Sequence, residues 1–82
     1  MNRPPVDLIV ERAMRAATSS DAGAGAVEEL IRIAQGRRAS LEAAHSVLVE
    51  RLHRRPDDFD ATGALLLVIR ALQQVGHDPR RN

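Results

Sequence analysis

The stretch GALLLVIRALQQVG, residues 63–76, is the most informative about the fold, because it sets six apolar residues in a row, from Ala64 to Ile69, within a segment of helical spacing. At about 100° per residue, the apolar positions of this segment form a stripe about 200° wide. A surface helix that faces one core needs a stripe of only roughly 100°. We therefore expect a helix over residues 58–75 that lies at the centre of the domain. The stripe contains Ala61, Ala64, Leu65, Leu67, Val68, Ile69, Ala71, Leu72 and Val75.

Outside this wide stripe, the same segment carries a second edge formed by Phe59, Gly63, Leu66 and Arg70. Two large apolar side chains flank a glycine, so another helix could approach closely there, with the arginine at the border. We predict this edge as a partner-binding surface. Two further apolar side chains are predicted as outlying contacts, namely Leu8 and Val47.

An alternative keeps the edge within one chain. Phe59 would fold back onto Leu52, and Leu66 would meet the N-terminal helix, since scattered exposed apolar residues are common on small domains. If this alternative fails, the self-complementary outcome is a two-fold dimer through the C-terminal helix.

Three further segments show the helical period, at residues 5–18, 26–35 and 41–55. Pro5 suits a first turn, Gly36 suits the end of the second helix, and Ser40 is the expected N-cap of the third. The first apolar face comprises Val6, Ile9, Val10, Ala13, Met14, Ala16 and Ala17. The second comprises Ala26, Val27, Leu30, Ile31, Ile33 and Ala34. The third comprises Leu41, Ala44, His45, Leu48, Val49 and Leu52.

The expected fold is a small all-α bundle or array of four helices in one domain, residues 1–82. Pro56 ends the third helix, and Asp57 or Asp58 caps the fourth, so these two helices form a hairpin. The first two helices then pack across that hairpin. Residues 19–25 are expected to be a flexible loop and residues 77–82 a flexible tail.

Composition excludes several classes of protein. The chain has 82 residues without a cysteine, so disulfides and thiolate metal sites are absent. Its net charge is +1, and its single aromatic residue is Phe59, which makes stacking on bases or sugars an improbable main binding mode. The N-terminal stretch is interrupted by Asp7 and Glu11 before a signal peptide could form, so we expect a cytoplasmic protein without a membrane segment.

All 12 basic residues are arginines, and five of them suggest an alternative function in binding nucleic acid. They occur at both ends of the third helix, separated by roughly 25 Å, and three aspartates neutralise the second group. The alternative is therefore a small DNA- or RNA-binding regulator that uses Arg37, Arg38, Arg51, Arg54 and Arg55.

No pattern in the chain predicts catalysis. It has no phosphate-binding glycine loop, no paired histidines at metal spacing and no nucleophile with a base placed beside it. His45 lies in an apolar stripe without a second ligand one turn away, so we expect a neutral packing residue and neither a metal site nor a cofactor.

The stretch EAAHSVLVERLHRRPDDFDATGALLLVI resembles the junction between two tetratricopeptide repeats. Ala44, Leu48 and Pro56 have the spacing of that family's second helix, and Leu65 and Ile69 that of the next first helix. The chain has no 34-residue repeat. We therefore interpret the resemblance as the geometry of a helix hairpin, which in that family serves peptide binding or scaffolding.

Together these observations predict a noncatalytic, cytoplasmic protein-interaction or homodimerisation module of an adaptor or regulatory kind. Its partner would be another protein or a second copy of itself. We expect no membrane and no small-molecule substrate.

Overall fold

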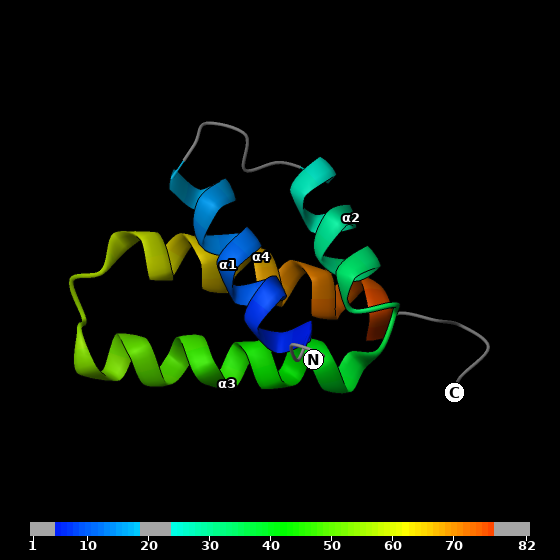
Figure 1. The fold of residues 1–82 in the computed structure, drawn as a ribbon. Coiled ribbons are helices and arrows are strands. Elements are labelled where there is room, and N and C mark those ends of the chain that lie inside the picture. Colours follow the sequence, from blue (N-terminus) through cyan, green and yellow to red (C-terminus); the bar gives the residue numbers. More distant parts are fainter. Residues whose placement is uncertain (1–4, 19–23, 77–82) are drawn as a thin grey trace.

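The computed structural model describes residues 5–18 and 24–76, which form four helices and no strands (Figure 1). In chain order these are α1 (Pro5–Thr18), α2 (Ala24–Ile33), α3 (Arg38–Arg54) and α4 (Phe59–Gly76). The predicted all-α class with four helices is confirmed. The predicted loop at residues 19–25 overlaps the start of α2 at Ala24 and Gly25, and its remainder and the tail at 77–82 lie outside the described residues.

Helices α3 and α4 run side by side in opposite directions as the predicted hairpin (Figure 1). The chain leaves α3 at Arg55, whose N–H donates to the carbonyl of Arg51 at 2.9 Å. Pro56 follows, and the N–H of Asp58 donates to the carbonyl of Arg55 at 3.1 Å. The proline removes a backbone donor and fixes its own φ, so α3 ends, and α4 begins after two more residues.

Asp58 is the residue that caps α4. Its Oδ1 accepts a hydrogen bond from the N–H of Ala61 at 3.1 Å, and its Oδ2 accepts one from Nε of Arg51 at 3.1 Å. One carboxylate therefore satisfies a free N–H at the start of α4 and ties α4 to the last turn of α3. Its side chain is 15% exposed.

These two contacts predict how Asp58 affects stability at low pH. The hydrogen bond from Ala61, and next the one from Arg51, lower the pKa of Asp58 below its ordinary value of 3.8. The contribution of ionised Asp58 to the free energy of unfolding is complete above pH 3.8. It is lost as the pH falls through the lower pKa that Asp58 has in the folded chain. We expect Asp58→Ala to lower the melting temperature at pH 7, and this effect to shrink as the pH falls below 3.8, as followed by circular dichroism. Asp57→Ala, one residue earlier and exposed, is the control; an equal loss in both variants would contradict the assignment.

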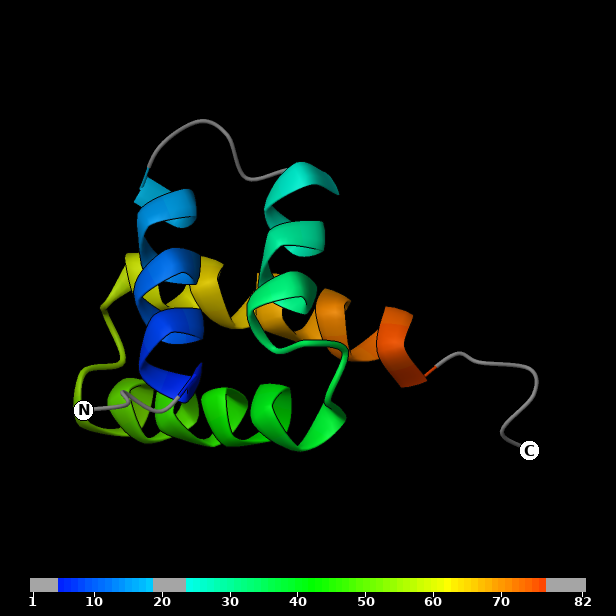
Figure 2. The same cartoon turned by 45° about the vertical axis from the view of Figure 1, so that its right-hand side comes forward.

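Helix α4 packs against α1, α2 and α3, which confirms the central place that its wide apolar stripe predicts (Figure 2). Helices α1 and α2 lie next to each other across one face of the hairpin and contact each other as well. The buried core comes from all four helices, with its members at Ile9, Ala13, Val27, Leu30, Ala34, Leu41, Ala44, Leu48, Ala61, Ala64, Leu67, Val68 and Ala71.

The two N-terminal helices are joined by an ion pair between Arg12 and Glu29, 2.7 Å apart and partly exposed. Helix α2 ends in a tight turn in which Gln35 and Gly36 have positive φ values of 57° and 71°. The N–H of Gly36 donates to the carbonyl of Ile31 at 2.9 Å, the bond that closes a Schellman motif. Gly36 therefore takes part in the predicted cap, but the first left-handed residue is Gln35.

Two local predictions for α3 are wrong. The helix begins at Arg38 with Arg37 as its N-cap, so Ser40 lies inside the first turn. The turn after α2 explains the earlier start, because the N–H of Arg37 is already held by the carbonyl of Ala34 at 3.0 Å. Val49 was predicted in the core stripe but is 44% exposed, because α1 and α4 pack on the other side of α3.

Candidate interaction surface

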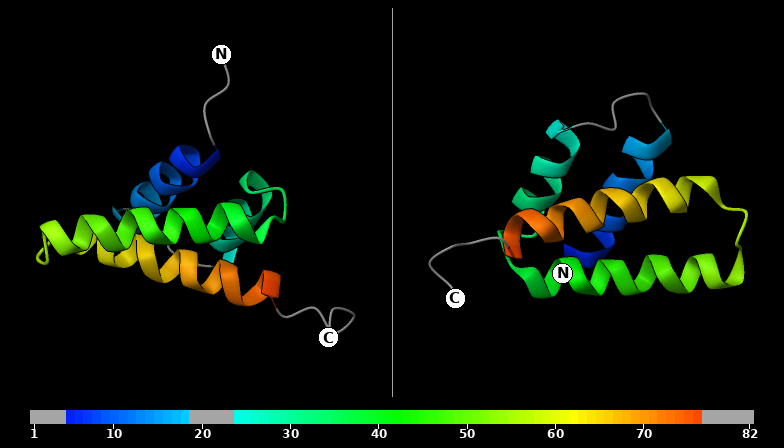
Figure 3. Two further views of the ribbon diagram at one scale, coloured as in Figure 1. Left: turned by 90° about the horizontal axis from the view of Figure 1, so that it is seen from below. Right: turned by 180° about the vertical axis from the view of Figure 1, so that it is seen from behind.

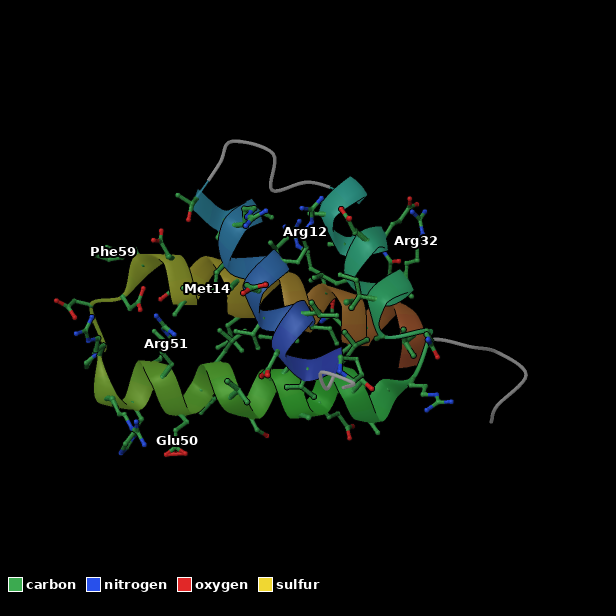
Figure 4. The ribbon with its side chains drawn as sticks, in the orientation of Figure 1. Arg12, Met14, Arg32, Glu50, Arg51 and Phe59 are labelled. Atoms are coloured by element: carbon green, nitrogen blue, oxygen red, sulfur yellow. The ribbon has the colours of Figure 1, made fainter. Side chains whose placement is uncertain are left out.

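The predicted partner-binding residues lie on the outer side of α4. Phe59 is 82% exposed and extends away from the rest of the molecule at the α3–α4 turn (Figure 4). Leu66, two turns further along the helix, is 57% exposed, and Arg70 is also exposed. The alternative in which both apolar side chains are covered within the chain is therefore wrong for the described residues, since neither is buried.

Gly63 has a different environment from its three predicted companions. A Cβ atom built on it would lie 2.9 Å from Cβ of Ala17, so α1 of the same chain occupies the space that the glycine leaves open. The approach predicted at this glycine was that of a partner helix, but the helix that lies there is α1 of the same chain. Gly63 consequently lies at the border of the exposed surface, where it positions α1 against α4.

The outlying apolar residues lie elsewhere on the molecule. Leu8 is 40% exposed and lines a groove with residues of α1 and α2, such as Glu29. Val47 is 45% exposed and lines a groove between α1 and α3 that includes Met14. Neither groove includes Phe59 or Leu66, so the structure does not join these residues into one surface with the outer side of α4.

The face of the hairpin opposite α1 and α2 is not covered by another described helix (Figure 3). An open groove of about 870 Å³ lies on the hairpin, between α3 and the C-terminal half of α4. Its lining includes His45 of α3 together with Ile69 and Gln73 of α4. The half-buried His45 therefore borders a groove, and its surroundings match the predicted packing role only in part.

Ile69 and Val49 were both predicted in the apolar stripes of their helices, and neither is buried in the core. Ile69 is only partly buried and Val49 is 44% exposed. Ile69 could have been recognised from its spacing, because it follows Leu66 by three residues and Thr62 by seven, which places all three on one side of a helix.

The arginines of the alternative function do not come together. Arg37 and Arg38 lie at the start of α3, and the other three lie at or just after its end. Arg38 pairs with Glu42 at 2.8 Å, and Arg51 pairs with Asp58 at 3.1 Å. Two of the five guanidiniums are thus already bound to carboxylates, which reduces the positive charge available to a phosphate backbone.

Within residues 5–18 and 24–76, no polar or charged residue belongs to the buried set, and no three histidine, aspartate or glutamate side chains come together as a metal-binding group. No helix in that part of the chain is long and apolar enough to cross a membrane. On the outer side of α4, the described residues present an exposed apolar surface.

Comparisons of the chain with known protein families, with curated proteins and with solved structures found no match.

Proposed function

We propose that this protein is a noncatalytic interaction module that dimerises through the outer side of α4. One observation carries the proposal. The inner side of α4 is already packed against three helices, yet its outer side keeps Leu66 57% exposed and Phe59 82% exposed. Burial of a side chain of this size is worth about 1.5–3 kcal/mol, so covering both on two chains is a substantial driving force for association.

The composition of the surface supports binding to a protein. Aromatic residues and arginine are enriched in interfaces, and charged residues are depleted at their centres. Here Phe59 and Leu66 form the apolar part, and Arg70 lies beside them at the rim. An adaptor or regulatory role in the cytoplasm is compatible with such a module.

The test is the mass in solution. We expect the purified 9.0 kDa chain to have the mass of two chains in light scattering at micromolar concentrations. Leu66→Glu should raise the dissociation constant at least about tenfold, because each dimer would bury two unpaired charges. Helicity should stay unchanged, since the side chain lies outside the core.

Val47→Glu is the matched control, with a 45% exposed apolar residue on α3 replaced by the same charge. We expect this variant to keep the mass of two chains. A one-chain mass for the unmodified protein, or a dimer that survives Leu66→Glu, would contradict the proposal.

A further inference from the structure

Six residues on the outer side of α4 form a row whose regular spacing specifies how a partner could fit. Spacings of three and four alternate along the outer side, which is the a/d pattern of a coiled coil. We call this row the outer seam, and it consists of Phe59, Thr62, Leu66, Ile69, Gln73 and Gly76. All are exposed except Ile69, which is partly buried. The buried residues of α4 lie at other heptad positions, so the outer seam and the core use opposite sides of the helix.

We propose that the outer seam pairs with the outer seam of a second copy in antiparallel orientation, with Leu66 against the partner's Ile69. This inference rests on the proposed function and specifies its partner and geometry. In an antiparallel pair, a positions of one helix meet d positions of the other. The same register places Thr62 against the partner's Gln73 and Phe59 against the partner's Gly76, and the two-fold axis repeats each contact.

This register matches every position by size and polarity. The largest residue of the seam meets the smallest, the two polar residues meet each other, and the two aliphatic residues meet at the centre. The hydroxyl of Thr62 donates to the carbonyl of Asp58 at 3.2 Å, so its oxygen can still accept a hydrogen bond from the amide of the partner's Gln73.

Neighbouring registers match less well. Moving the partner by one heptad in one direction sets Thr62 against Leu66, and moving it in the other sets Ile69 against Gln73. Each pairs an apolar residue with a polar one. A parallel pair sets Phe59 against Phe59 at one end and Gly76 against Gly76 at the other, which leaves a gap where the two glycines meet.

At its C-terminal end, the outer seam has a site at Gly76 where an aromatic ring of the partner could pack. A Cβ atom on Gly76 would lie 2.6 Å from Nη1 of Arg38, so this guanidinium lies beside the glycine. Nε of the same guanidinium donates a hydrogen bond to Oε2 of Glu42 at 2.8 Å. The partner's Phe59 would therefore pack over a glycine and next to an oriented cation, an arrangement that cation–π attraction favours.

Ile69, Gln73 and Gly76 of the outer seam line the groove beside α3, so pairing of the two seams also brings the α3 helices of the two hairpins toward each other. The uncovered face of the hairpin, including Val49 and the groove beside His45, would then be enclosed (Figure 3). The proposed dimer therefore packs the two hairpins face to face, as two layers of two helices.

Cysteine pairing tests this register cleanly, because the natural chain contains no cysteine. Chains with Thr62→Cys are mixed with chains with Gln73→Cys in glutathione buffer; both positions are exposed. We expect the mixed 62–73 disulfide to form well above the share that random pairing gives, and each variant alone to form few disulfides. The control is Glu28→Cys on α2, an exposed position away from the seam, which should cross-link with neither.

The results of the cysteine and Leu66→Glu experiments test the antiparallel register and the proposed function independently. Preferential 62–62 and 73–73 disulfides, in a dimer that Leu66→Glu still dissociates, would overturn the antiparallel register and leave the proposed function standing. A dimer that Leu66→Glu does not affect, or a chain that stays monomeric, would overturn both. Circular dichroism of each cysteine variant shows whether its helices are intact.

Discussion

Leu48→Ala is expected to destabilise the protein by about 2–5 kcal/mol, because it removes a fully buried side chain from α3 and leaves a cavity beneath α1 and α4. A core in so short a chain supplies only about 3–5 kcal/mol, so this substitution removes much of the stability. Urea unfolding followed by circular dichroism, at one fixed protein concentration, gives the difference in the free energy of unfolding.

The adjacent residue provides the control for this experiment. Val47→Ala also shortens an aliphatic side chain of α3, but Val47 is 45% exposed. We expect its effect to stay within about 0.5 kcal/mol, as for other surface positions. Comparable losses in the two variants would show that the side of α3 that faces the core has been assigned incorrectly.

Gly63→Ala is expected to be the other strongly destabilising change, although alanine is the better helix former. The added methyl group would lie 2.9 Å from Cβ of Ala17, so α1 must move away from α4. Overpacking of this kind typically costs about 1–3 kcal/mol, which exceeds the gain of about 0.5–1 kcal/mol from helix propensity. Thermal and urea unfolding should both show a net loss.

Gly25→Ala is the matched control, because Gly25 also lies in a helix but has no atom within 4 Å of an added Cβ. We expect this variant to be as stable as the natural chain or slightly more stable. In the double variant Gly63→Ala with Ala17→Gly, the clash disappears, so the two changes should be strongly non-additive. Additive effects would contradict the close crossing of α1 and α4 at this glycine.

The comparison of Gly63 with Leu66 shows why the candidate surface was only partly predictable. Helical spacing places both residues outside the wide apolar stripe of α4. In the structure α1 crosses at Gly63, whereas Leu66 remains 57% exposed. Which neighbour covers which edge depends on the crossing angle and separation of two helices that are distant in the chain, and neither quantity is contained in the spacing of one segment.

The start of α3 illustrates a second kind of limit. Ser40 has the chemistry of an N-cap, but the tight turn at Gln35 and Gly36 brings the chain into helical geometry earlier. Val49 was misplaced because it lies at the edge of its apolar stripe, where burial depends on whether a further helix packs there. No described helix does, so Val49 remains on the surface.

The positions of the four helices to within a few residues, the hairpin at Pro56 and an aspartate, and the central place of α4 could all be predicted from the residues alone. These features follow from local rules, because apolar periodicity, proline geometry and capping act over a few neighbouring residues. Three features became visible only in the folded chain: α1 packs over Gly63, Asp58 ties α4 to Arg51, and the outer seam keeps its exposed apolar residues. Those outcomes depend on contacts between helices, and such contacts are set by how whole apolar faces pack together in space.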